Sequence, residues 1–167
     1  MVSKQYIVPS LQALDVSYQN AASPDDAERF AKLAIIELCG WIEESMDELI
    51  HRCSRRNLKI QQNRDYCLNE IVKPTYGFDY HKHFRAMLIR LLGLICLEEI
   101  ESKLDQAKLV TLKSTLGNLR VVRDSVAHTH LKGVTRTLDA PSLTIRSFQR
   151  VYDGLLDLDQ TMRRAGW

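Results

Sequence analysis

The sequence lacks the patterns that define several classes of protein. Its four cysteines lie far apart, without a C-x-x-C pair, at Cys39, Cys53, Cys67 and Cys96. This spacing suggests no disulfide framework, so we expect reduced thiols in a cytoplasmic protein, with Cys39 and Cys53 as small core residues. No alternating strand pattern, low-complexity run or internal repeat is present. The absence of a strand pattern favours a helical fold.

Segments that would enter a membrane are also missing. The first five residues are not followed by an apolar core and a cleavage site, so no signal peptide is predicted. The most apolar run, residues 86–97, contains Arg90 and is too short to span a bilayer. We expect this run to form a buried helix, and we expect no membrane partner.

The composition fits one soluble domain. The chain has 167 residues, 45% hydrophobic and 26% charged, with a net charge of +2. This length can bury a sizeable core, so residues 1–167 are expected to form a single domain. Residues 108–136 contain a single acid, Asp124. They contain six basic residues, namely Lys108, Lys113, Arg120, Arg123, Lys132 and Arg136. Such a concentration suits an anionic ligand, although basic residues at helical spacing also form ordinary solvated faces.

Helical signals along the chain predict an all-α, up-and-down bundle of about five to six helices. The expected helices cover residues 3–20, short or broken around Pro9; 23–56, capped by Ser23; 58–72; 79–104; a segment from about Gln106; and a last segment capped by Ser142 or Thr144. Apolar stripes at steps of three and four support three of them. These stripes are Ile35, Cys39, Ile42, Met46, Leu49 and Cys53; Phe84, Leu88, Leu91 and Ile95; and Phe148, Val151, Leu155, Leu158 and Met162.

The helix that begins near Gln106 carries the candidate site. Its apolar stripe runs through Leu109, Leu112, Leu116, Leu119 and Val126. Arg123 falls on this stripe, and Asp124 and His128 are four residues apart, so they stack on a neighbouring face. The pattern therefore predicts a guanidinium, a carboxylate and an imidazole close together near the C-terminal end of this helix.

These three groups suit phosphodiester chemistry without a metal. Arginine can hold a phosphate with two parallel hydrogen bonds, and histidine can take or give a proton near neutral pH. Aspartate one turn before histidine could accept an imidazole N–H and fix its tautomer. Cleavage of RNA needs both a base for the 2′-hydroxyl and an acid for the leaving oxygen. One histidine does not easily serve as both, but a two-fold dimer would supply a pair.

The segment Arg123-Asp124-Ser125-Val126-Ala127-His128 resembles the R-x4-6-H motif of the HEPN superfamily. The leucine-rich approach to it, the alanine before histidine, and the following loop and amphipathic helix are similar to that family too. Residues 41–45 in an early helix and 81–85 before the motif helix extend the resemblance over most of the chain.

The resemblance implies a HEPN-like helical bundle and a metal-independent endoribonuclease without a cofactor. Proteins with this motif act as homodimers with a composite cleft, so the expected partners are RNA, a second copy of the chain, and an antitoxin or other regulatory protein. Arg123 would stabilise the phosphate, His128 would transfer a proton and Asp124 would orient them. Beyond the motif, we expect Arg120, His130 and Lys132 to contact RNA.

The resemblance also implies a biological setting, a toxin or antiviral defence effector that acts in abortive infection. One branch of the family continues its motif as R-x4-H-x-Y, and a partner nucleotidyltransferase modifies the tyrosine. His130 occupies that place in this sequence. Control by that modification is therefore not expected.

Other interpretations of the same residues remain open. The first is a non-catalytic HEPN module that dimerises, docks a partner, or binds RNA or nucleotide. A second is a metal site in which His81 and His83 combine with His128 and His130. A third makes Arg123 a buried structural partner of Glu43 or Glu44. The acid cluster to which these two belong, Glu43, Glu44, Asp47 and Glu48, otherwise forms solvated surface or positions the arginine for catalysis. Finally, three aromatic residues could stack on bases or simply pack, namely Tyr76, Phe78 and Tyr80.

Overall fold

The computed structural model describes residues 1–127 and 138–167, and all regular structure within them is helical. The prediction of an all-α chain is confirmed. In the described ranges there are seven α-helices and two short π-helical segments, which exceeds the five to six helices expected. They are α1 (Ile7–Gln19), α2 (Pro24–Asn57), α3 (Gln61–Tyr66), η1 (Cys67–Val72), η2 (Tyr80–Phe84), α4 (Arg85–Leu92), α5 (Leu94–Ser102), α6 (Gln106–Ala127) and α7 (Pro141–Arg164).

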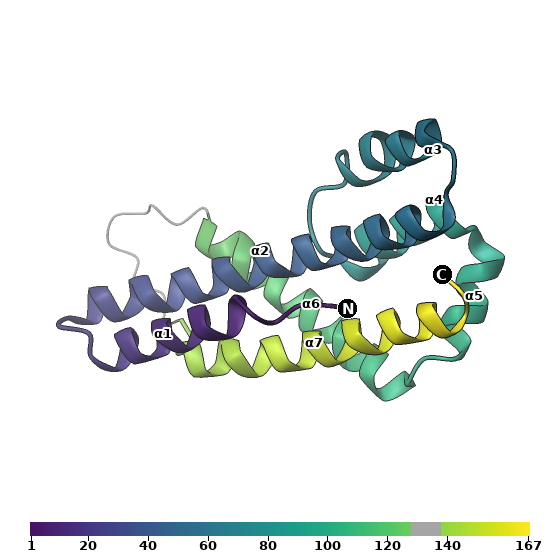
Figure 1. Cartoon of the computed structure of the whole chain (residues 1–167). Helices are drawn as coiled ribbons and strands as arrows, with labels where there is room; N and C mark the ends of the chain where they lie inside the picture. The colour runs from purple at the N-terminus through teal and green to yellow at the C-terminus, as the bar shows by residue number, and fades with distance from the viewer. Residues whose placement is uncertain (128–137) are drawn as a thin grey trace.

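The body of the molecule is an elongated bundle built along α2 (Figure 1). Helix α1 packs against α2 and α7, and α6 packs against α7 and α2. Helix α2 begins as predicted, because Ser23 Oγ accepts the backbone N–H of Asp26 at 3.2 Å and Pro24 opens the first turn. All six residues of its predicted stripe, Ile35 to Cys53, are buried.

The first helix is short and is not broken at Pro9, so the first of the two alternatives for residues 3–20 holds. Helix α1 starts at Ile7, so Pro9 lies in its first turn. Backbone N–H groups in the first turn have no partner within the helix, so the missing N–H of proline costs nothing there. Buried Ile7 and Leu11 fix this helix to the bundle.

Residues 58–72 form a shorter and less regular structure than the single helix predicted. Helix α3 begins only at Gln61, and from Cys67 the chain continues as the π-helical η1. The pair rises from the end of α2, and residues 73–79 then descend to the body (Figure 1). Buried Cys67, Ile71 and Val72 face the core, and η1 contacts α2 and α4.

The predicted helix over residues 79–104 is interrupted, and the expectation of one buried helix over 86–97 is wrong. Gly93 has a φ of +81°, which only glycine adopts readily, and it separates α4 from α5. The break turns the apolar stripe away from the core. Ile95, expected inside, is 79% exposed, whereas Phe84 and Leu88 are buried.

Helices α6 and α7 confirm their predicted apolar faces. The stripe of α6, Leu109 to Val126, and that of α7, Phe148 to Met162, are both buried. The two helices approach closely at Gly154, where an added Cβ would lie 2.7 Å from the Cβ of Leu112. The predicted caps Ser142 and Thr144 are wrong, because α7 already begins at Pro141 and its N-cap is Ala140.

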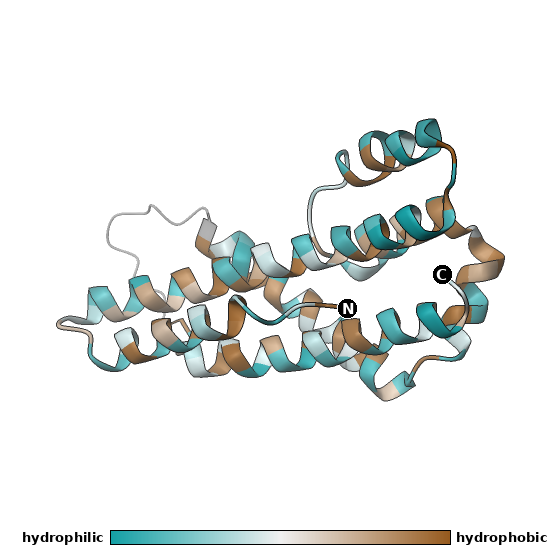
Figure 2. Cartoon of the chain, in the orientation of Figure 1, coloured by the Kyte–Doolittle hydropathy of each residue, from teal (hydrophilic) through white to brown (hydrophobic). Residues whose placement is uncertain are grey.

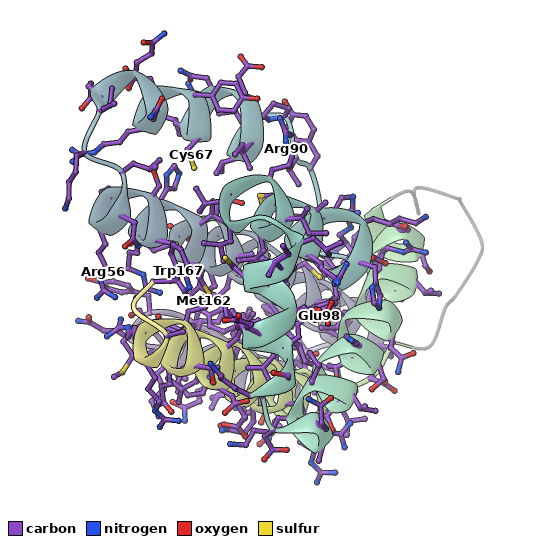
Figure 3. The ribbon with its side chains drawn as sticks, turned by 90° about the vertical axis from the view of Figure 1, so that its right-hand side faces the viewer. Arg56, Cys67, Arg90, Glu98, Met162 and Trp167 are labelled. Carbon is purple, nitrogen blue, oxygen red and sulfur yellow. The ribbon has the colours of Figure 1, made fainter. Side chains whose placement is uncertain are left out.

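Aromatic rings join α2 to α7 in the middle of the bundle. Trp41 meets Phe148 edge to face, with ring centroids 4.9 Å apart. At the C-terminal end of α7, the backbone N–H of Trp167 donates to the carbonyl of Met162 at 2.9 Å, and Figure 3 labels both residues. Hydrophilic residues cover much of the outer side of α2 in Figure 2. Within the described ranges, no helix combines the length and the apolar character needed to cross a membrane.

Candidate functional site

Arg123 occupies a defined position on α6, between two carboxylates. Its Nη1 donates to Glu43 Oε1 of α2 at 3.0 Å, and its Nε and Nη2 donate to Asp124 Oδ1 at 3.1 and 2.9 Å. The Arg123 side chain is 33% exposed. Among the described residues, these bonds engage three of the five N–H donors of a guanidinium. The group is therefore oriented from two sides and still reaches solvent.

The Arg123 guanidinium packs against a buried aromatic ring. The Arg123 Cζ lies 5.2 Å from the centroid of the Phe78 ring, a cation–π contact with a residue that is 1% exposed. Cys39 lies close by, and burial raises its pKa to about 12, an effect that the Arg123 charge opposes. Cys39 is therefore a neutral thiol at physiological pH and a poor nucleophile.

Arg120, one turn earlier on α6, is tied to a different carboxylate. Its Nη1 donates to Asp79 Oδ2 at 3.2 Å. Asp79 also caps η2, since its Oδ1 accepts the backbone N–H of Lys82 at 2.9 Å. That backbone bond, aided by Arg120, holds the pKa of Asp79 below its usual value. Asp79 thus fixes the 73–79 connection to the helix that carries Arg123.

His83 has a structural role in this connection. Its Nδ1 accepts the backbone N–H of Asp79 at 3.0 Å. Gly77 packs against the same ring with a φ of +111°, and an added Cβ would lie 2.7 Å from His83 Cε1.

Among the residues that the structure describes, no group of three potential ligands gathers that could hold a metal ion. The other half of the alternative metal site, His128 and His130, lies outside the described residues.

The three aromatic residues near the site have different environments. Phe78 and Tyr80 are buried in the core, which matches the interpretation that these aromatic residues pack within the fold. Tyr76, in contrast, is 83% exposed. The Tyr80 hydroxyl donates to Glu101 Oε1 at 2.9 Å, and Arg85 Nε donates to the same oxygen. Burial alone would raise the pKa of Glu101, but these hydrogen bonds lower it. Tyr80 is therefore a core residue with a satisfied hydroxyl.

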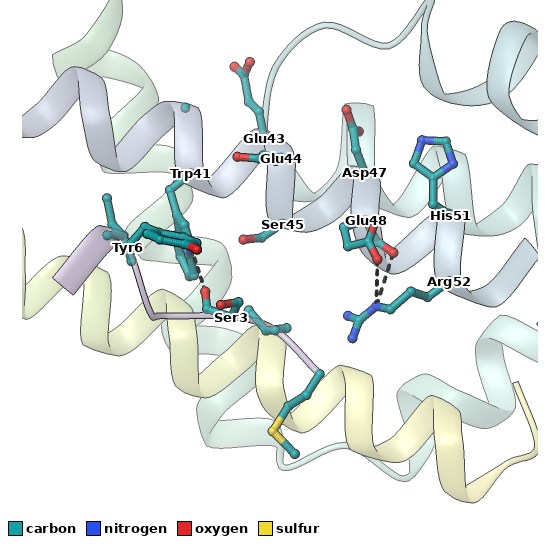
Figure 4. A pocket seen from close by; sticks show the side chains of 14 residues that line it. Ser3, Tyr6, Trp41, Glu43, Glu44, Ser45, Asp47, Glu48, His51 and Arg52 are labelled. Atoms are coloured by element: carbon teal, nitrogen blue, oxygen red, sulfur yellow. Dashed lines mark hydrogen bonds and ion pairs between the residues drawn. The ribbon is translucent and has the colours of Figure 1, made fainter. Parts of the chain in front are cut away.

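A cavity of about 760 Å³ lies between α2 and the N-terminal segment, and Glu43, the partner of Arg123, is among its lining residues. Figure 4 shows Trp41 and Tyr6 together over Ser3, and Trp41 Nε1 donates to the Ser3 carbonyl at 2.9 Å. Four acids line the cavity, namely Glu43, Glu44, Asp47 and Glu48. Burial, aided by the negative charge of Glu43, raises the pKa of Asp47 to about 6. This acidic lining is unsuited to a polyanion such as RNA.

The predicted site residues divide into two groups. The structure brings Arg123, Asp124 and Arg120 to one end of α6, while His128, His130 and Lys132 lie outside the described residues. The bond to Glu43 matches the interpretation that Arg123 pairs with an acid of α2. Asp79 was expected only to begin a helix, and its bond to Arg120 spans 41 residues, so helical spacing carried no signal for it.

Comparison with family models, with curated proteins and with solved structures finds no match.

Proposed function

We propose that this protein is a metal-independent endoribonuclease that acts as a homodimer. The observation that carries the proposal is the placement of Arg123, which Glu43 and Asp124 orient while a third of its side chain stays exposed. A fixed guanidinium at an accessible position can stabilise charge on a phosphorane without reorganising during the reaction. The R-x4-H pattern then supplies His128 four residues after Asp124.

The proposed chemistry is a transesterification within the RNA strand. The 2′-hydroxyl attacks phosphorus, the bond to the 5′-oxygen breaks, and the products carry a 2′,3′-cyclic phosphate and a 5′-hydroxyl. His128 of one protomer accepts the 2′-hydroxyl proton, and the partner's His128 donates a proton to the leaving oxygen. Arg123 contacts the phosphate, and Asp124 holds Arg123 in position. The biological role that accompanies this activity is that of a toxin or antiviral defence effector.

The test is cleavage of mixed cellular RNA in excess EDTA. We expect the unmutated protein to cut and to leave cyclic phosphate ends. His128→Ala should lose roughly 10²- to 10⁴-fold in rate, the usual contribution of a general acid or base. Arg123→Ala should lose roughly 10²- to 10³-fold. Arg29→Ala, an exposed arginine near the start of α2, is the matched control and should keep full activity.

A second function is favoured by the two carboxylates at Arg123. They offset the charge that would stabilise a phosphorane, which fits a module that docks a partner or binds RNA without cutting. This module would bind RNA in the same assay and cut none over a wide range of protein concentration. Cleavage that EDTA abolishes would contradict both functions.

A further inference from the structure

One exposed aromatic residue has no packing role in the fold. Tyr76 is 83% exposed, while the two aromatic residues that follow it, Phe78 and Tyr80, are almost fully buried. Its ring is open to solvent and to a ligand, as are the rings of Tyr6 and Tyr66, which are 80% and 56% exposed. The core therefore does not explain the ring at position 76.

The backbone around Tyr76 is held on both sides. Before it, Thr75 donates its N–H to the Val72 carbonyl at 2.9 Å and its hydroxyl to the Ile71 carbonyl at 2.7 Å. After it, Gly77 lies against the ring of His83, which accepts the N–H of Asp79. The ring therefore projects from an ordered loop, so little conformational entropy is lost when a ligand stacks on it.

The same loop connects Tyr76 to the cations of α6. Phe78 lies under the guanidinium of Arg123, and Asp79 accepts from Arg120. Two residues of chain span at most about 7 Å, so Tyr76 lies within a few nucleotides of a phosphate held by Arg123. Exposed Lys73, His81 and Lys82 add positive or titratable groups along this loop and the start of η2.

We propose that Tyr76 stacks on a base of single-stranded RNA whose phosphate lies at Arg123, an assignment that rests on the proposed function. An aromatic face beside a row of cations is the arrangement that binds single strands, because each base offers a π-face and the cations follow the phosphates. Bases inside a duplex are already stacked on one another. Tyr76 therefore makes the site prefer single strands.

The test measures binding separately from cleavage. A fluorescently labelled RNA with 2′-O-methyl groups throughout has no attacking hydroxyl, so its anisotropy reports affinity alone. We expect Tyr76→Ala to weaken binding roughly 5- to 150-fold, the range for loss of one stacked base, and Tyr76→Trp to bind at least as tightly as the unmutated protein. Binding of a duplex of the same length should not change. Tyr66→Ala removes another exposed tyrosine, on α3, and is the matched control.

The outcomes separate this assignment from the proposed function. Affinities of Tyr76→Ala and Tyr66→Ala within about twofold of each other would overturn the stacking assignment, as would a lack of binding by the unmutated protein. If natural RNA is still cut in those cases, the ribonuclease proposal survives. Weaker binding by Tyr76→Ala in a protein that cuts no RNA would support stacking and reject catalysis. Unchanged melting of both variants shows that the comparison is made between folded proteins.

Discussion

The ion pairs at Arg123 fix a position more than they stabilise the fold. Side chains of Arg123, Glu43 and Asp124 are each at least a third exposed, and pairs of this kind contribute about 0–1 kcal/mol. Their geometric effect is larger, because a bond from α2 and a bond from α6 leave the guanidinium little freedom. Glu43 nevertheless reduces the attraction of the site for a phosphate.

This balance leads to a prediction for Glu43→Gln. The amide oxygen can still accept from Arg123, so the guanidinium keeps its position while one negative charge close to it disappears. We expect RNA to bind roughly 3- to 5-fold more tightly, the effect of one unit charge a few ångströms away in a well-solvated site. The free energy of unfolding should change by less than about 1 kcal/mol.

Glu44→Gln is the control for Glu43→Gln, because it makes the same change in net charge at an exposed neighbouring position on α2. Anisotropy titrations at low and high salt measure both variants. An equal gain in affinity for the two would show that only net charge matters, and that the bond between Glu43 and Arg123 has no specific effect on RNA binding.

At the scale of elements, helical periodicity correctly predicted which faces of α2, α6 and α7 are buried. The stripes of α2, α6 and α7 are buried as expected, because an apolar face of a helix has no stable place other than the core. Periodicity did not predict the break at Gly93 or the π-helical turns of η1 and η2, since these depend on backbone geometry set by tertiary packing.

The candidate site was predictable only where its residues share one helix. The spacing of Arg120, Arg123 and Asp124 placed them together at one end of α6. Their partners lie on other elements, and the bond from Arg123 to Glu43 spans 80 residues. Acid composition suggested Glu43 or Glu44 as a partner, but the choice between them depends on how α2 is rotated against α6. Such a rotation is fixed by packing and cannot be read from local spacing.

The contact that sets α6 against α7 gives a prediction at this scale. In Gly154→Ala the new Cβ would meet the Cβ of Leu112, an atom fixed to the backbone of α6, so the two helices must move apart. We expect a loss of about 1–3 kcal/mol in the free energy of unfolding, as for other overpacked contacts. Urea denaturation followed by circular dichroism provides the measurement.

Gly117→Ala on α6 is the matched substitution for Gly154→Ala. A Cβ at Gly117 has nothing within 4 Å, so this variant should gain about 0.5–1 kcal/mol from the better helix propensity of alanine. Equal gains for both variants would mean that α6 and α7 do not approach each other as closely at Gly154 as the structure has them.

At the scale of the whole molecule, acids and arginines gather in neighbouring regions along α2 that share Glu43. The cavity beside the N-terminal segment is acidic, whereas Arg120 and Arg123 lie toward the 73–79 connection. If the proposed function holds, this charge distribution directs an RNA strand toward Arg120 and Arg123. Val121, two residues before Arg123, is 66% exposed and offers apolar surface that a second protomer would cover.

The homodimer proposal makes a quantitative prediction for mixed protomers. If cleavage needs His128 from both chains, a mixed dimer with one His128→Ala protomer is inactive. Equal amounts of unmutated and variant chains, unfolded and refolded together, should then keep about a quarter of the activity of the same total amount of unmutated protein, because only that fraction of dimers is fully unmutated. Independent protomers would keep about one half.

The full dependence on mixing ratio makes this test decisive. Activity should follow the square of the unmutated fraction for a composite site and the fraction itself for separate sites. Arg29→Ala, which is exposed near the start of α2, replaces His128→Ala in a control mixture that should keep full activity at every ratio. Light scattering on the same samples gives the mass. A linear dependence in a sample of dimeric mass would mean that dimerisation does not build the active site, so that each His128 would have to serve as base and acid alone.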